Sequence, residues 1–153
     1  MTTEELAEYG IESMDGRAVA DFVEAQNSGV LGLPGPEPYL VPLSYGYDGE
    51  SLFFSFLEGE ESKKGRLARE AERAAFLIYT AESAFTWESV LLAGPLREKP
   101  ADEWDHALDV LDEAWRPAVL EDAQMAADVR VFELAVDEQS GLRHAGLPPG
   151  MRQ

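Results

Sequence analysis

Residues 39–56 carry a pattern of side chains that only an extended chain can present on one face. Five apolar residues occupy every second position of its first half: Tyr39, Val41, Leu43, Tyr45 and Tyr47. Asp48-Gly49 follows, a dipeptide that favours a tight turn between antiparallel strands. The alternation resumes over residues 51–56, with Leu52, Phe54 and Phe56 on one side. The segment therefore predicts an antiparallel hairpin.

Other stretches predict more short strands and a few helices. Apolar runs bounded by turn residues predict strands at 29–33, 74–80, 85–96 and 129–136. Apolar residues at helical spacing predict helices at 16–26, 62–72 and 100–115. Residues 137–153 are rich in Gly and Pro and are expected to be irregular. Because no repeat or linker divides the chain, we expect a single α+β, mainly β domain over residues 1–153, a barrel or sandwich with flanking helices.

The charge of the chain limits its partners. Thirty acidic residues face twelve basic ones, which gives a net charge of −18. Such a surface repels nucleic acid and anionic membranes, so we expect neither as a partner. The carboxylate excess, with nine Arg and only three Lys, also indicates a halophilic host, where salt screens the self-repulsion of the protein.

Composition excludes several kinds of chemistry and suggests a cytoplasmic protein. The chain contains no cysteine, so disulfides, thiolate metal sites and a cysteine nucleophile are excluded. Its apolar runs are too short for a membrane span, and its first residues lack the basic and apolar segments of a secretory signal. The only histidines, His106 and His144, are far apart in the sequence and show no ordered acidic partner, so no metal site is expected.

The lysines are scarce, and two of the three are adjacent. Lys63 and Lys64 stand at the start of the predicted 62–72 helix, with Ser62 as its N-cap. The free N–H groups of a helix N-terminus attract anions, so this pair is a candidate anion site. The alternative is an ordinary solvated start of a surface helix.

The order of the motifs resembles that of the FMN-binding proteins of the pyridoxamine 5'-phosphate oxidase-like superfamily. The motifs are Gly29-Val30-Leu31-Gly32-Leu33, the strand from Tyr39 to Tyr45, the Asp48-Gly49 turn, Leu52 to Ser55, Ser62-Lys63-Lys64-Gly65, and Trp87 to Gly94. The N-terminal portion also resembles the branch that includes the nitroimidazole-resistance proteins. The resemblance implies a split β-barrel of about six antiparallel strands, an FMN-dependent oxidoreductase, and a homodimer with FMN at its interface.

The same resemblance implies roles for nine residues. Lys63 and Lys64 would bind the FMN phosphate together with Ser55, and Phe54 would contact the flavin. Val41, Pro42, Leu43 and Ser44 would line the isoalloxazine ring, and Ser89 would contact it through its hydroxyl. Pro42 cannot donate to a strand ladder, which fits a strand face left open for a ligand and equally fits an edge strand.

Two departures from the family pattern bear on the substrate. The oxidases proper have an arginine on the phosphate where this chain has Tyr39, and they hold pyridoxal with a C-terminal set of which only Arg143 and His144 are present here. We therefore do not expect a vitamin B6 substrate, and no catalytic side chain can be named. The alternatives are a reductase that binds the deazaflavin F420 in the same slot, a flavin-binding or redox-sensing module without turnover, and a cofactor-free dimeric scaffold.

Overall fold

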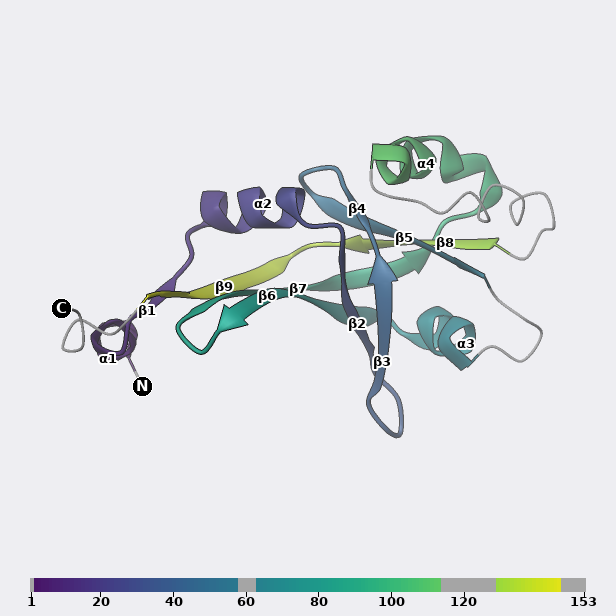
Figure 1. The fold of residues 1–153 in the computed structure, drawn as a ribbon. Helices are drawn as coiled ribbons and strands as arrows, with labels where there is room; N and C mark the ends of the chain where they lie inside the picture. Colours follow the sequence, from purple (N-terminus) through teal and green to yellow (C-terminus); the bar gives the residue numbers. More distant parts are fainter. Residues whose placement is uncertain (1, 58–62, 114–128, 147–153) are drawn as a thin grey trace.

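The computed structural model describes residues 2–57, 63–113 and 129–146 (Figure 1). Its four α-helices are α1 (Thr3–Glu8), α2 (Gly16–Ala25), α3 (Lys63–Glu70) and α4 (Trp104–Glu113), and a short 3-10 helix, η1 (Ala101–Glu103), precedes α4. The first five strands are β1 (Ile11–Ser13), β2 (Ser28–Leu33), β3 (Tyr39–Ser44), β4 (Gly46–Tyr47) and β5 (Ser51–Leu57). The other four are β6 (Arg73–Ser83), β7 (Thr86–Glu98), β8 (Val129–Ala135) and β9 (Glu138–Ala145).

All strand pairings in this sheet are antiparallel. The strands follow the order β3-β2-β6-β7-β8-β5-β4, and β9 pairs with both β7 and β1. The long strand β7 joins two halves, because it pairs with β6 and β9 along most of its length and with β8 over its last residues, Leu96 to Glu98. The expected antiparallel split barrel with flanking helices is confirmed, although the sheet has nine strands rather than about six.

The strand predicted at 39–47 is broken in two, and the break curls the sheet. β3 and β4 lie at opposite ends of the strand order although only Tyr45 separates them in the chain. Tyr45 is buried, and its hydroxyl donates a hydrogen bond of 2.5 Å to the carbonyl of Val23 in the last turns of α2. The alternation itself is confirmed, since Val41 is buried while Leu40 and Pro42 are exposed.

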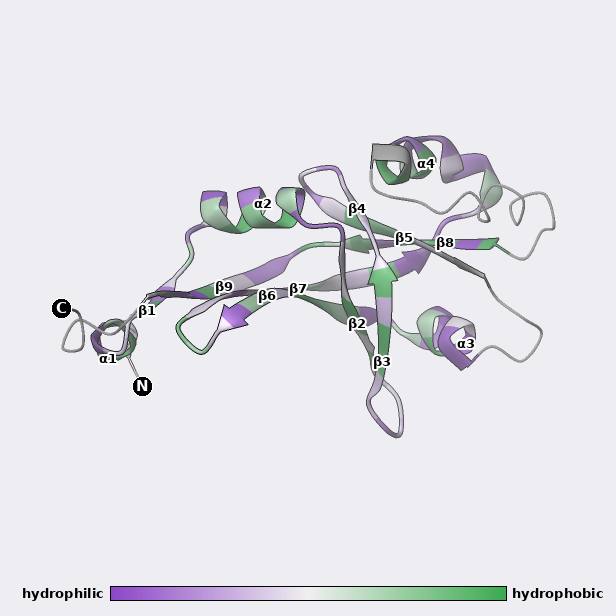
Figure 2. Cartoon of the chain, in the orientation of Figure 1, coloured by the Kyte–Doolittle hydropathy of each residue, from purple (hydrophilic) through white to green (hydrophobic). Residues whose placement is uncertain are grey.

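The core lies between the inner side of this curled sheet and the helices. α2 is amphipathic and packs its Val19, Phe22 and Val23 inward (Figure 2). α4 covers a second, smaller cluster in which Ala107, Val110 and Leu111 meet residues of β5 and β8. Within the described ranges, no helix is both long and apolar enough to cross a bilayer.

The prediction of an irregular tail from residue 137 is wrong for its first part. Residues 138–145 form β9, which pairs with β7 over eight positions and with β1 over three. Gly141, which favoured a turn in the sequence, is instead buried where the chain packs tightly. A Cβ added there would lie 2.9 Å from Met14 Sδ and 3.1 Å from Val19 Cγ2. The glycine permits a close approach rather than ending a strand.

Candidate functional site

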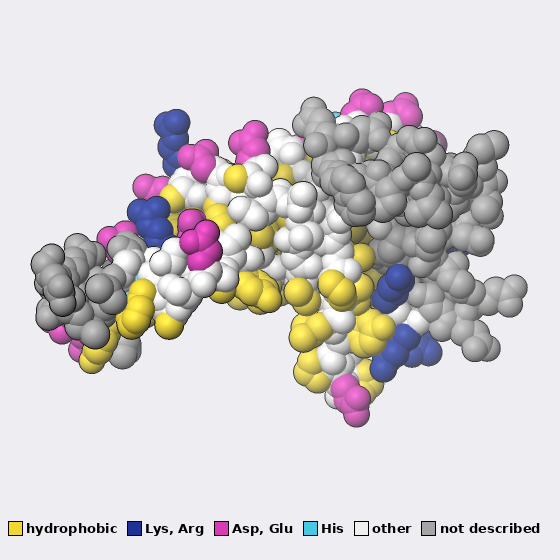
Figure 3. Space-filling model, viewed as in Figure 1, with side chains coloured by type: hydrophobic (Ala, Val, Ile, Leu, Met, Phe, Trp, Pro, Cys, Tyr) yellow, Lys and Arg dark blue, Asp and Glu magenta, His cyan; other side chains and the backbone are white. Residues whose placement is uncertain are grey.

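Helix α3 carries an unusual concentration of positive charge. Its eight residues, KKGRLARE, include four cations and one carboxylate, in a chain of net charge −18. Leu67 and Ala68 anchor the helix in the main core, and Gly65 is also buried. Lys63 is exposed and Lys64 half-buried at its first turn. Figure 3 shows dark blue side chains next to an apolar surface at this place.

The cations outside α3 are already neutralised. All six described Lys and Arg residues outside this helix form ion pairs with carboxylates. The pairs are Arg17–Asp21, Arg73–Asp137, Arg97–Glu103, Lys99–Glu133, Arg130–Glu98 and Arg143–Glu12. In the described part of the chain, α3 is therefore the segment whose own sequence has positive charge in excess.

The first lysine of α3 contacts the start of β3. Lys63 Nζ lies 5.2 Å from the centroid of the Tyr39 ring, which is a cation–π contact. Tyr39 is the residue that stands where the resemblance expects an arginine. The helix predicted to bind the phosphate and the strand predicted to line the ring are thus adjacent. Tyr39 carries no positive charge, but its ring contacts the Lys63 ammonium group. Ser62, the predicted N-cap, lies outside the described residues.

Strand β3, which is predicted to line the flavin ring, borders an open depression of about 520 Å³. Pro42, Leu43 and Ser44 of β3 line it, together with Ser28, Gly29 and Val30 of β2 and Tyr79 of β6. Val41, the fourth residue predicted on this strand, is buried and points into the core. Ser28 and Tyr79 were missed from the sequence, because only the strand register places them beside Ser44.

The depression belongs to a larger surface, here called the outer face, on the side of the sheet away from the core. Register pairs place its residues side by side across β3, β2, β6, β7 and β9. They are Ser28, Val30, Leu40, Pro42, Ser44, Leu77, Tyr79, Ser89, Leu91 and Leu142. None of these ten is charged, although Arg73 and Glu138 lie on the same side of the sheet at its edge. Leu40, Tyr79 and Leu91 are 69%, 59% and 47% exposed. Figure 3 shows part of this surface as a patch of apolar side chains below the sheet.

The remaining predicted site residues are not gathered in the depression. Ser89 lies on the outer face directly across from Tyr79. Phe54 is fully buried and its ring lies 4.9 Å from that of Phe76, so its side chain is closed to a ligand in this structure. Ser55 is half-buried on β5 and does not line the depression either. One copy of the chain therefore divides the nine predicted residues among the depression and outer face, α3, the core and, for Ser55, strand β5.

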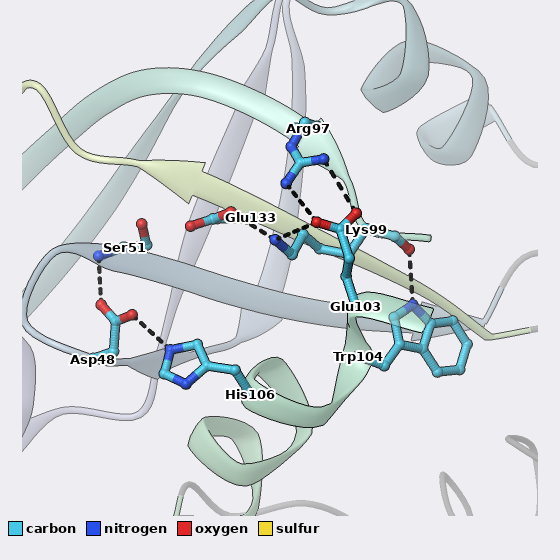
Figure 4. Close-up of polar contacts among 8 residues, drawn as sticks. All are labelled: Asp48, Ser51, Arg97, Lys99, Glu103, Trp104, His106 and Glu133. Carbon is cyan, nitrogen blue, oxygen red and sulfur yellow. Dashed lines mark hydrogen bonds and ion pairs between the residues drawn. The ribbon is translucent and has the colours of Figure 1, made fainter. Parts of the chain in front are cut away.

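Away from the outer face, a polar network ties α4 and η1 to the sheet (Figure 4). His106 Nε2 lies 2.9 Å from Asp48 Oδ2, so the expectation that His106 has no ordered acidic partner is wrong. Burial alone would raise the pKa of Asp48, but hydrogen bonds from His106 and from the N–H groups of Ser51 and Glu50 outweigh it and lower that pKa. The described part of the chain holds no cluster of three or more potential metal ligands.

The second histidine is buried in an aromatic setting. His144 is 9% exposed, and its ring lies 5.3 Å from that of Phe85 and 6.0 Å from that of Trp87. Its Nδ1 has no hydrogen-bond partner among the described residues. His144 is thus part of the packing at the β1–β9–β7 end of the sheet.

Comparisons with known proteins agree with this architecture. Residues 15–143 match the family model of pyridoxamine 5'-phosphate oxidase. A FAD-binding protein from Mesorhizobium loti has a similar structure, with a TM-score of 0.69 and 24% identity over 87% of this chain and 97% of that one. A FAD- and haem-binding protein from Mycobacterium smegmatis gives 0.71 and 19%, over 89% and 75% of the two chains.

A third solved structure has the same fold. It is a proposed 5-nitroimidazole antibiotic resistance protein from Bacteroides thetaiotaomicron, with a TM-score of 0.64 and 17% identity over 88% of this chain and 89% of that one. No curated protein matches the sequence. At these identities, the solved structures establish the fold alone, and any chemistry has to be argued from the residues of this chain.

Proposed function

Because the chain belongs to the pyridoxamine 5'-phosphate oxidase family, matched over residues 15–143, we propose that it is a flavoprotein that binds FMN between two copies of itself. In this proposal it is a cytoplasmic FMN-dependent oxidoreductase with a substrate other than vitamin B6. The observation that carries the proposal is the excess positive charge of α3 beside the start of β3. No other described segment of this acidic chain carries a cluster of cations.

The phosphate of FMN would lie at the first turn of α3. A dianionic phosphate needs cations and hydrogen-bond donors, and Lys63 and Lys64 supply both at a helix N-terminus. Tyr39 holds the Lys63 side chain near β3 through its ring face. Ser55 is the hydroxyl that the family resemblance adds to this end.

The flavin ring would lie along β3, in the depression lined by Pro42, Leu43 and Ser44. β3 pairs with β2 alone among the described strands, so its other edge offers main-chain groups to a ligand. The hydroxyls of Ser28, Ser44 and Tyr79 provide further partners for the polar edge of the ring. The mixture of apolar wall and hydroxyl groups fits a planar heterocycle with a polar edge.

A second copy of the chain would cover the outer face and complete the site. In one copy, Ser89 lies on the outer face and Lys63 lies on α3. In a twofold dimer, one copy would supply the serine of a flavin site and the other copy the lysine. The outer face is uncharged, while two chains of net charge −18 repel elsewhere. Contact through the middle of this face would therefore bury exposed Leu40 and Leu91 at residues that carry no carboxylate.

When bound, FMN would supply hydride-transfer chemistry that no side chain of the protein can provide. The protein's own residues would bind and orient it. Lys63 and Lys64 would fix the anionic end, β3 would hold the ring plane, and Leu77 and Leu91 of the outer face would exclude water from the slot.

Replacing both lysines tests the proposal. We expect Lys63→Ala/Lys64→Ala to weaken FMN binding by at least about tenfold, since two charge-assisted contacts to phosphate are lost. Titration of the apoprotein with FMN, followed by flavin fluorescence, measures this change. Arg17→Ala/Arg97→Ala is the matched control, because it removes the same charge from cations outside α3. Equal FMN affinity of wild type and the lysine variant would refute the assignment of the FMN phosphate to Lys63 and Lys64. An F420 absorption spectrum of the purified protein would refute FMN as the cofactor.

A further inference from the structure

A second hollow, of about 440 Å³, lies at the Tyr39 end of β3, where the phosphate of FMN is proposed to bind. The end of β2, the turn from β2 to β3, the first two residues of β3 and the start of β6 line it. Among the described residues, it shares none with the depression proposed for the flavin ring. Helix α3 adjoins it, because a Cβ added at Gly35 of the turn would lie 3.4 Å from Leu67 Cδ2. A ligand that extends past the FMN phosphate would therefore reach this second hollow.

The second hollow is open because residue 32 is a glycine that the fold does not require. Gly32 lies between Leu40 and Ala75 of the neighbouring strands. A Cβ added to it would meet only the Ala75 carbonyl oxygen at 3.6 Å and Leu40 Cδ2 at 3.8 Å, which are ordinary contacts. In the same strand, by contrast, a Cβ at Gly29 would collide with the carbonyl oxygen of Leu77. Packing therefore accounts for Gly29 but not for Gly32, whose missing side chain leaves room for a ligand.

Two cations of the adjoining helix have no carboxylate partner. Lys63 and Arg66 are both exposed, three positions apart in α3, and so lie side by side on the helix. Among the described residues neither forms an ion pair, although Glu70 follows Arg66 at the spacing that favours one. The six described cations outside α3 are all paired. The spacing of Lys63 and Arg66 suits the two adjacent phosphates of one pyrophosphate.

The remaining cation at the second hollow is already neutralised. Arg73 lines the hollow and donates to both carboxylate oxygens of Asp137, at 2.7 and 2.8 Å. Because its charge is balanced, Arg73 does not call for an anion in the hollow itself. A guanidinium group also packs against the faces of uncharged aromatic rings. The second hollow therefore suits an uncharged ring, and the unpaired cations of α3 suit the anionic group attached to it.

We infer that the flavin site continues into a subsite for an adenylyl unit, so that the chain binds flavin adenine dinucleotide, FAD, more tightly than FMN. The inference rests on the proposed function for the position of the flavin and of its first phosphate. Lys63 and Lys64 hold that phosphate, and Arg66 binds the second one. The adenine ring lies in the second hollow, over Gly32 and against Tyr39 and the start of β6.

A variant that fills the second hollow tests the inference. We expect the wild-type apoprotein, titrated by flavin fluorescence, to bind FAD at least about tenfold more tightly than FMN. Gly32→Val should reduce this ratio to about one, because valine occupies the space of the adenine ring and is itself favourable in a strand. FMN and FAD each carry about two negative charges near pH 7, so the charge of the protein affects both alike. A wild-type protein that binds FAD no more tightly than FMN would overturn the inference and leave the proposed function standing.

A matched pair of arginine variants tests the second phosphate. Arg66→Ala should lower the preference for FAD over FMN several-fold, because the contact to the second phosphate is lost. Arg17→Ala removes the same charge from an exposed helical arginine of α2 and should keep the wild-type ratio. The same ratio in both variants would overturn the role of Arg66.

AMP tests the second hollow without a flavin, since it carries the same ring and one phosphate. In equilibrium dialysis, AMP should bind to the wild-type protein, be displaced by FAD, and fail to bind to Gly32→Val. AMP that binds equally to both proteins, or that stays bound at saturating FAD, would overturn the inference. If neither flavin binds while AMP still distinguishes wild type from Gly32→Val, the proposed function is refuted and the adenylyl subsite is retained.

Discussion

Asp48 shows how one side chain can organise two elements. Its Oδ1 accepts from the N–H groups of Glu50 and Ser51, at 2.9 and 2.7 Å, and so closes the β4–β5 turn. Its Oδ2 meets His106 of α4, whose ring also packs edge-on against Phe53 at 5.4 Å. The turn was predictable from Asp48-Gly49 alone. The partner 58 positions away was not, because nothing local in the sequence records which helix will cover the hairpin.

The lowered pKa of Asp48 predicts a pH-dependent loss of stability. A carboxyl whose pKa is lower in the folded state stabilises the protein above its unfolded pKa, and this contribution disappears as the pH falls through the folded pKa. Asp48→Asn should therefore lower the free energy of unfolding at pH 7, and its curve should converge with that of wild type below about pH 4. Urea unfolding across this pH range measures both. A constant difference at all pH values would contradict the prediction, and Asp102→Asn, at an exposed carboxylate of η1, is the control.

At the scale of elements, helix α4 approaches β4 more closely than most side chains would allow. A Cβ at Gly46 would lie 2.8 Å from the carbonyl oxygen of Val110 and 2.9 Å from its Cγ1. Gly46→Ala should therefore push α4 off the hairpin and destabilise the protein by about 1–3 kcal/mol. Thermal or urea unfolding measures the change. Gly16→Ala, where the added Cβ meets only an ordinary contact at 3.6 Å, should be neutral or slightly stabilising, and an equal loss in both variants would contradict the close-approach argument.

The elements that the sequence predicted well are those whose side-chain pattern is local. The 51–56 strand and the 16–26 helix differ from β5 and α2 by no more than one residue at either end. The break at Tyr45 and strand β9 were missed because both depend on distant contacts. Tyr45 is held by Val23 of α2, and β9 is held by its register with β7. The same distinction holds for the candidate site. The order of the family motifs predicted Pro42 and Ser44 as site residues, whereas Tyr79 could be assigned to the depression only from the strand pairing in the sheet.

At the scale of the whole molecule, the proposed dimer depends on contact between two copies through the outer face. Leu91 lies across from Leu77 near the middle of this face and is 47% exposed. Leu91→Glu would place a carboxylate between two copies and bury it without a partner, so we expect a monomer. Sedimentation velocity measures the state of association. Tyr9→Glu adds the same charge at a residue 57% exposed beyond the outer face and should leave the dimer intact. A dimeric Leu91→Glu protein would place the interface elsewhere.

The net charge of −18 is a second property of the whole molecule. Self-repulsion among thirty acidic residues destabilises the compact state, and salt screens it. We expect the melting temperature to rise between about 0.1 M and about 1 M KCl. A melting temperature that falls or stays level over this range would argue against a halophilic origin.

Strand β7 hydrogen-bonds to β6, β8 and β9, so both halves of the barrel share it. If this strand detaches, β6, β8 and β9 each lose a partner strand and the two halves are no longer joined. Amide protons at its centre, near Val90 and Leu92, should consequently exchange with solvent only when the entire sheet opens. α1 or the β2–β3 turn can open locally while the remaining sheet stays folded, but the separation of β7 is equivalent to losing the native state.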